Sequence, residues 1–247
     1  MSARILTQTL AEADSALIIQ LSDTHLTPRH GVPETLQWLL DAVRAEPPDL
    51  MVVTGDVVEE DPDDAIDRAF AHEVLTSVPC PVVAIPGNHD IGFYDEVVER
   101  DRRIAAFVET WGADRFCLDV AGWRLVGANA YLLGESNHDI WLHDAVTTAL
   151  PVAVFVHQPV GGDPADGWEM PPVAREAFER STAGADIRHV ISGHRHRSFD
   201  GGRIVWAPST TFRGPVEQDS YATDPTPGAV AYSFNGDGTS GVHFVRP

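Results

Sequence analysis

The chain has 247 residues, of which 17 are basic and 37 acidic, so its formal net charge at pH 7 is −20. A field of this sign repels long nucleic acids and anionic membranes, and we expect neither as a partner. All the basic side chains are arginines, which excludes lysine Schiff-base chemistry and the lysine-dependent phosphate-binding loop. The hydrophobic share of 43% is typical of a globular protein, and because the sequence contains no repeat, low-complexity segment or linker we expect a single domain over residues 1–247.

The first 17 residues contain acidic side chains and no long apolar core, unlike a signal peptide. No apolar run elsewhere reaches membrane-spanning length, and these features together predict a soluble, cytoplasmic protein. Cys80 and Cys117 lie in short apolar segments without the surroundings of a catalytic cysteine. We predict that both are buried free thiols.

Short β-branched runs alternate with helical patterns over the first two-thirds of the chain. These patterns predict strands at 16–21, 50–54 and 81–85, and helices at 34–45, 61–78 and 95–110. Further strands are predicted at 116–120, 123–128, 152–156, 187–191 and 203–206, with a helix at 172–182 and a terminal hairpin at 228–234 and 242–245. Repeated strand–helix units predict a mixed α/β protein with a substantial parallel component.

Polar side chains of the kinds that bind metals follow five of these strands. In chain order they are Asp23 and His25, Asp56, Asn88 with His89 and Asp90, His157, and lastly His194 and His196. The carboxyl ends of parallel strands meet at one edge of a sheet, where α/β proteins place their ligand sites. We therefore expect these side chains to lie close together.

Neutral imidazoles mixed with carboxylates suit Zn²⁺, Mn²⁺ and iron, whereas an all-oxygen set would favour Mg²⁺ or Ca²⁺. Seven such ligands are too many for one catalytic ion that keeps an open position, but they suit two ions sharing a carboxylate. Two ions about 3.5–4 Å apart can hold a hydroxide and bind both the attacking and the leaving oxygen of a phosphoryl group. Each motif alone is weak, because a Gly-Asp pair after a strand is commonly a turn. Their order and regular placement carry the interpretation.

The ordered set Asp-x-His, Gly-Asp, Gly-Asn-His-Asp, His and Gly-His-x-His resembles the signature of the calcineurin-like metallophosphoesterases, over residues 21–196. The compact spacing and the Ser-Asp-Thr-His-Leu opening are most similar to the bacterial class III cyclic-nucleotide phosphodiesterases. The resemblance implies a four-layer αββα sandwich, two mixed β-sheets flanked by helices. It also implies that Asp56 bridges two Mn, Fe or Zn ions, the first held by Asp23, His25 and His196 and the second by Asn88, His157 and His194.

The activity that the resemblance implies is hydrolysis of small phosphodiesters, 3′,5′-cyclic nucleotides among them, by attack of a metal-bridging hydroxide. His89 is implied as a catalytic residue that stabilises the transition state or protonates the leaving oxygen. Many relatives orient this histidine with an aspartate, and Glu59 stands at that position here. The alternatives are a phosphomonoesterase or nucleotide pyrophosphatase of the same fold, and a catalytically silent protein-binding scaffold. The intact ligand set argues against the scaffold.

Several further features of the sequence leave alternatives open. Arg195 is expected to pair with a surface carboxylate rather than with substrate. Within the rim loop 161–170, Trp168 or Met170 either stacks on a base or forms a hydrophobic plug. Segment 212–227 is a surface excursion or the contact of a homodimer. Segment 236–241 matches a dinucleotide-binding pattern but opens no helix, and we interpret it as a hairpin turn. The remaining histidines are expected at the surface or in support of the ligands: His30, His72, His138, His143, His189 and His243.

Overall fold

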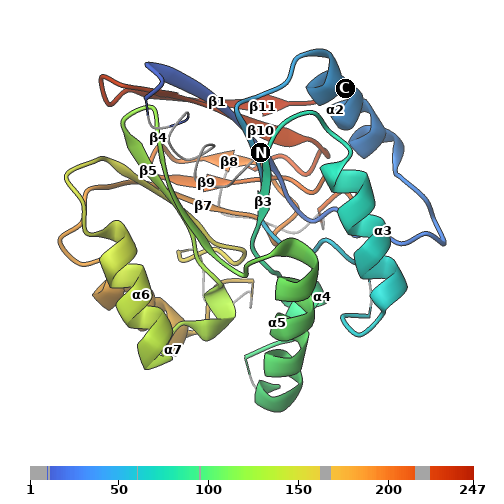
Figure 1. Ribbon diagram of the computed structural model, residues 1–247, viewed down its shortest axis with the longest axis horizontal. Helices are drawn as coiled ribbons and strands as arrows, with labels where there is room; N and C mark the ends of the chain where they lie inside the picture. Colours follow the sequence, from blue (N-terminus) through green and yellow to red (C-terminus); the bar gives the residue numbers. More distant parts are fainter. Residues whose placement is uncertain (1–9, 11, 60, 95, 162–167, 215–222) are drawn as a thin grey trace.

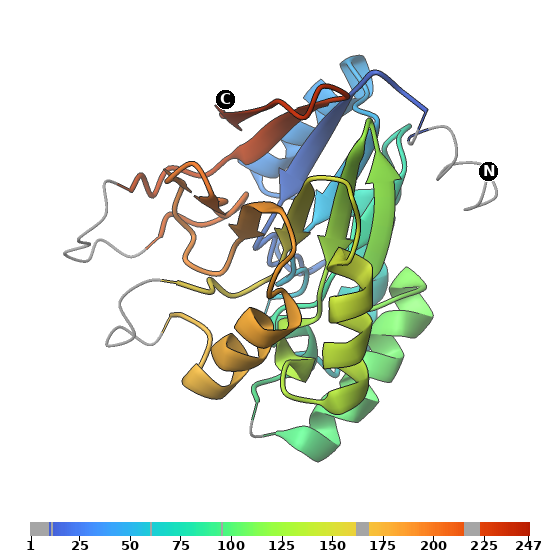
Figure 2. The same ribbon diagram turned by 90° about the vertical axis from the view of Figure 1, so that its left-hand side faces the viewer.

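Two β-sheets face each other at the centre of the computed structural model, which describes residues 10, 12–59, 61–94, 96–161, 168–214 and 223–247 (Figures 1 and 2). The first sheet has the order β11 (Ser240–Val245), β10 (Ala229–Asn235), β1 (Ser15–Leu21), β2 (Leu50–Val53) and β3 (Val82–Ala84). The second has the order β4 (Phe116–Val120), β5 (Trp123–Gly127), β6 (Val152–Phe155), β7 (Ile187–Ser192), β9 (Ile204–Trp206) and β8 (Phe199–Asp200).

Both sheets are mixed. In the first, β1, β2 and β3 are parallel, whereas β10 and β11 run antiparallel at one side. In the second, β5, β6, β7 and β9 are parallel, and β4 and β8 are antiparallel edge strands. The carboxyl ends of the parallel strands provide the ligand-binding edge predicted from the sequence.

Helices flank the sheet pair on both sides. The helices α2 (Glu34–Ala45) and α3 (Ala65–Thr76) lie on one side, and α6 (Ser136–Val146) and α7 (Pro172–Ser181) lie on the other (Figure 1). Helix α5 (Val97–Trp111) packs beside α3 and beside the short helix α4 (Asn88–Ile91). This arrangement confirms the predicted class, two mixed sheets flanked by helices.

Strand β2 shows how the sequence builds these layers, because its side chains alternate between two cores. Leu50 and Val52 belong to the cluster between the sheets, and Met51 and Val53 belong to the cluster that includes Leu40 of α2. All four strand residues are fully buried. A strand covered on both faces reads as a continuous apolar run, which is why the pattern was recognisable.

The second predicted helix, 61–78, begins later than expected. Instead of starting at residue 61, α3 starts at Ala65, because the Asp64 carboxylate accepts hydrogen bonds from the backbone N–H groups of Ile66 (2.7 Å) and Asp67 (3.3 Å). A carboxylate in this position caps the N-terminus of a helix. The preceding Asp61 instead accepts a hydrogen bond from the Asp63 N–H in a turn.

One helix was not predicted, and the expectation for the cysteines was wrong. The sequence did not predict α6, whose buried positions include His138 beside Leu142 and Ala145, so its apolar stripe is interrupted. Cys117 is exposed rather than buried, because it lies on the edge strand β4, and Cys80 is only half-buried. Both are free thiols. In the described part of the chain, no helix combines the length and apolarity that a bilayer crossing requires.

Candidate metal centre

The loops at the carboxyl ends of five strands bring the predicted metal-binding residues together. Two groups form there, in each of which the ligand atoms lie within 4.8 Å of one another. The first consists of Asp23, His25 and His196, and the second of Asp56, His157 and His194. Asn88, the first residue of α4, adjoins the second group, so all seven predicted ligands converge at one place.

Backbone hydrogen bonds hold these loops against one another. The Asp23 N–H donates to the Gly55 carbonyl (3.0 Å), and the His25 N–H donates to the Asp56 carbonyl (3.0 Å). Within the second sheet, the Gly193 N–H after β7 donates to the His157 carbonyl after β6 (3.0 Å). The positions of the ligands are therefore fixed by main-chain contacts between the strand ends.

The backbone of the ligand loops is strained. Six described residues other than glycine have a positive φ, and five of them are predicted ligands: Asp23 (53°), His25 (43°), Asp56 (51°), His194 (67°) and His196 (52°). Each such residue costs on the order of 1–3 kcal/mol, and strain of this kind gathers at functional sites. The residues with this costly backbone conformation are the ones whose side chains come together at the candidate metal centre.

Two glycines allow the loops to approach so closely. Gly55 has a φ of +91°, and a Cβ there would lie 2.5 Å from the Gly87 nitrogen. A Cβ on Gly87 would overlap the Asp56 carboxylate. The Gly-Asp and Gly-Asn-His-Asp motifs therefore need glycine because each loop occupies the space that a side chain on the other would fill.

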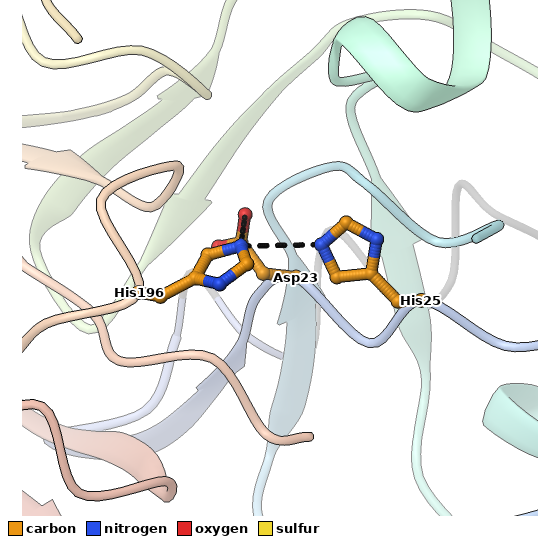
Figure 3. Close-up of side chains that lie close together, drawn as sticks. All are labelled: Asp23, His25 and His196. Carbon is orange, nitrogen blue, oxygen red and sulfur yellow. Dashed lines mark hydrogen bonds and ion pairs between the residues drawn. The ribbon is translucent and has the colours of Figure 1, made fainter. Parts of the chain in front are cut away.

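In the first group, the imidazoles of His25 and His196 face each other, with their Nε2 atoms 3.2 Å apart and the Asp23 carboxylate beside His196 (Figure 3). Asp23 Oδ1 lies 3.2 Å from His196 Nε2 and is buried without a well-aligned hydrogen-bond donor among the described residues. Burial alone would raise the pKa of Asp23, but the neighbouring His196 outweighs it and lowers that pKa to about 2. Burial lowers the pKa of His25 to about 4. An ionised carboxylate next to a neutral imidazole is a ligand pair for a divalent cation.

In the second group, polar atoms surround His157 Nε2 on several sides. It lies 3.1 Å from His194 Nδ1, 3.2 Å from Asn88 Oδ1 and 3.3 Å from Asp56 Oδ2. His157 Nδ1 donates to the Thr54 carbonyl at 2.7 Å, which orients the ring. Burial would lower the pKa of His157, but the Asp56 carboxylate raises it to about 9. The negative charge of Asp56 that retains a proton on His157 would also attract a metal cation. The nitrogen and oxygen atoms of this group therefore fit an ion of the Mn, Fe or Zn type.

Asp56 lies between the two groups. Its Oδ2 is 3.3 Å from His157 Nε2 and 4.0 Å from His25 Nε2. Its Oδ1 accepts a hydrogen bond from the His89 N–H at 2.9 Å. The adjacent histidines hold the pKa of Asp56 well below its usual range although the carboxyl is buried. One ionised carboxylate therefore faces both groups of ligands.

His89 lies at the open side of the centre. Its ring meets the ring of His25 edge-on, with the centroids 4.7 Å apart. It lines a cavity of about 350 Å³ together with Asp56, Asn88, Phe93, Trp168, His194 and His196. The Glu59 carboxylate, expected to orient His89, lies instead 3.8 Å from His30 Nε2.

Sequence reasoning missed two supporting residues. The carboxylate of Asp90 accepts hydrogen bonds from the backbone N–H groups of Gly87 (2.8 Å), Val57 (3.0 Å) and Val58 (3.3 Å), and so ties the loops after β2 and β3 together. The Tyr131 hydroxyl donates to Asn88 Oδ1 at 3.3 Å. Asp90 belongs to the Gly-Asn-His-Asp motif, but the motif did not indicate what this residue does. Nothing in the sequence pointed to Tyr131, which lies in a short 3₁₀ turn (Ala130–Leu132).

The open alternatives at the rim are partly resolved. Arg195 pairs with Glu169, but both side chains are buried, so the expected surface carboxylate was wrong. Met170 is a core residue, whereas the Trp168 ring lies 5.3 Å from that of His194 at the mouth of the cavity. Residues 162–167 and 215–222, which belong to the two segments singled out in the sequence, lie outside the described residues.

The profile of the calcineurin-like phosphoesterase family matches residues 16–198, and the chain belongs to this family. It is accordingly a metal-dependent phosphoric ester hydrolase. It is 28% identical to the 3′,5′-cyclic adenosine monophosphate phosphodiesterase CpdA of Escherichia coli (strain K12), over 95% of this chain and 91% of that protein. It is also 28% identical to the serine/threonine-protein phosphatase CPPED1 of Bos taurus, over 62% of this chain and 55% of that protein.

The fold is shared with a solved enzyme. The crystal structure of a dimetal phosphatase from Danio rerio superposes with a TM-score of 0.57, covering 93% of this chain and 98% of that one. The two sequences are only 15% identical, so this likeness concerns the fold. It confirms the predicted architecture.

Proposed function

We propose that the protein is a dinuclear metal-dependent phosphodiesterase that hydrolyses small phosphodiesters, with 3′,5′-cyclic nucleotides as its candidate substrates. The observation that carries the proposal is the position of Asp56, whose Oδ2 lies within 4.0 Å of a histidine from each group. A carboxylate in such a position suits two ions that share one ligand. The similarity to CpdA along nearly the whole chain supports the substrate class.

The ligand assignment follows the two groups. Asp23, His25 and His196 would hold one ion, while Asn88, His157 and His194 would hold the other, with Asp56 between them. When bound, two cations of the Mn, Fe or Zn type would activate water as the nucleophile and neutralise charge on the phosphoryl oxygens.

The chain's own residues supply orientation and proton transfer. The His89 N–H holds one oxygen of Asp56, so the other oxygen remains directed toward the two groups. The His89 side chain lines the cavity next to these ligands, where it can donate a proton to the leaving oxygen. An imidazole suits this role because it exchanges protons near neutral pH.

The size and charge of the molecule favour a small substrate. The cavity at the ligands has a volume of about 350 Å³. The net charge of −20 repels long polyanions, so a small diester enters where a nucleic acid would not.

The proposal is tested by the turnover of 3′,5′-cAMP and bis(p-nitrophenyl) phosphate by Mn²⁺-loaded protein. We expect hydrolysis of both, and in the Asp56→Ala variant a loss of essentially all turnover, because the shared ligand is removed. Asp186→Ala is the matched control, since this exposed carboxylate pairs with Arg188 at the surface. Faster hydrolysis of the monoester p-nitrophenyl phosphate than of either diester would identify a phosphomonoesterase instead.

A further inference from the structure

Two exposed aromatic rings lie beside the metal centre. Phe93 (51% exposed) and Phe212 (42% exposed) are the exposed phenylalanines of the described chain. The Phe212 ring lies 5.4 Å from that of His25, whereas Phe93 lines the catalytic cavity with His89. An exposed ring at the mouth of a site offers a surface on which a planar group stacks.

A second cavity adjoins the catalytic one on the His89 side. It has a volume of about 310 Å³, and the two cavities meet at Asn88, His89 and Phe93. Its remaining wall consists of Pro62, Gly92, Glu96 and Arg103. A substrate whose phosphoryl group lies at the ligands would therefore have room to extend past His89 into this second cavity.

We propose that the second cavity binds the nucleoside part of the substrate, with its base stacked on Phe93. This inference rests on the proposed function, because His89 marks the leaving-group side only if the phosphoryl group lies at Asp56. It assigns a specificity-determining role to a residue outside the metal ligands.

Phe93 is held in place by a chain of polar contacts. Its backbone N–H donates to the Glu96 carboxylate at 3.0 Å. Arg103 on α5 lies 3.5 Å from the same carboxylate and donates to both oxygens of Asp63, at 3.2 and 3.1 Å. The backbone of Phe93 is therefore anchored to the start of helix α5 rather than carried on an unsupported loop, which limits where its ring can lie and suits a stacking surface.

The charge of the cavity favours a neutral group over a second phosphate. The Arg103 side chain, only 13% exposed, is shared between the carboxylates of Asp63 and Glu96. Hydrogen bonds from Arg103 and Arg102 lower the pKa of Asp63 to about 2, so this carboxylate stays ionised. With its positive charge already balanced, Arg103 does not attract a further anion. In the cavity wall, the Glu96 carboxylate can still accept hydrogen bonds and the Arg103 guanidinium can still donate them, as the edge of a base requires.

The test is binding of adenosine, which has no phosphoryl group, to the full Mn²⁺-loaded chain by isothermal titration calorimetry. Phe93→Ala should weaken binding at least about fivefold, the lower end of what one base–aromatic stack contributes. Phe93→Tyr keeps the ring and should bind like the wild type. Val98→Ala is the control, because Val98 is 79% exposed in the first turn of α5 and is not part of the cavity wall.

Three results would overturn the inference. The first is equal affinity for adenosine in the wild type and in Phe93→Ala. The second is a larger loss of affinity in Phe212→Ala than in Phe93→Ala. The third is an active wild-type protein that hydrolyses bis(p-nitrophenyl) phosphate and binds inorganic pyrophosphate but does not bind adenosine. Failure of the proposed function differs from failure of this inference, because the protein would then show no metal-dependent hydrolysis of bis(p-nitrophenyl) phosphate. Calorimetry measures adenosine binding without any turnover.

Discussion

At the scale of single residues, His89 is placed differently from the histidines of the two candidate ligand groups. Each histidine of the two groups lies within 3.2 Å of another polar atom of its group, so these rings are committed to the ligand set. His89 instead meets His25 through the edge of its ring and lines the cavity. Its backbone, not its imidazole, contacts Asp56.

Replacing His89 should therefore affect the rate but not the metal content. We expect His89→Gln to lower kcat for 3′,5′-cAMP on the order of 10²-fold or more, because the departing ribose oxygen needs a proton. The loss with bis(p-nitrophenyl) phosphate should be smaller, since p-nitrophenolate leaves without one. Steady-state kinetics on both substrates, with metal analysis of the same samples, measures this. Equal losses on the two substrates would contradict the role in proton transfer.

At the scale of elements, the site depends on how closely the loops after β2 and β3 approach. Gly87 fills the space beside Asp56, and Asp90 ties its loop to the backbone of Val57 and Val58. The sequence motifs specify these contacts indirectly, through a glycine and a carboxylate whose partners only the fold reveals.

Gly87→Ala should displace Asp56, because the added Cβ would overlap its carboxylate. We expect the variant to fold but to bind less metal and to lose activity. Gly161→Ala is a suitable control, since a Cβ there would lie 3.6 Å from Ile204, an ordinary contact. Circular dichroism and metal analysis of both variants provide the measurement. Full metal content in Gly87→Ala would contradict the steric explanation.

At the scale of the whole molecule, most strands and the convergence of the seven candidate ligands could be predicted, because their sequence signals are local. Strands such as β2 are short apolar runs, and each candidate ligand follows a strand. Tyr131 could not be predicted, because its contact with Asn88 joins residues 43 positions apart. Helix α6 was missed because His138 occupies one of its buried positions, where a pattern of apolar residues shows a gap.

His138 should make the stability of the whole protein sensitive to acid. Burial and the nearby Arg115 lower the pKa of His138 from 6.5 to about 4, although Asp114 and Asp139 act in the opposite direction. Between pH 6.5 and about 4, His138 is therefore protonated in the unfolded chain but neutral in the folded protein. The free energy of unfolding consequently falls as the pH decreases toward 4. The loss from this residue reaches at most about 3 kcal/mol.

Denaturant unfolding of wild type and His138→Gln between pH 4 and pH 7 measures this contribution. The variant should show a weaker pH dependence, whereas His243→Gln, at an exposed position on β11, should follow the wild type. Identical pH profiles for wild type and His138→Gln would refute the prediction.

The central claim, two ions sharing Asp56, is tested most directly by the metal content of the purified protein. Inductively coupled plasma mass spectrometry after reconstitution with Mn²⁺ should give two ions per chain for wild type and for Asp186→Ala. Asp56→Ala should lose both ions, because the carboxylate that faces both groups is removed. Two ions retained in Asp56→Ala, or a single ion in the wild type, would contradict the claim.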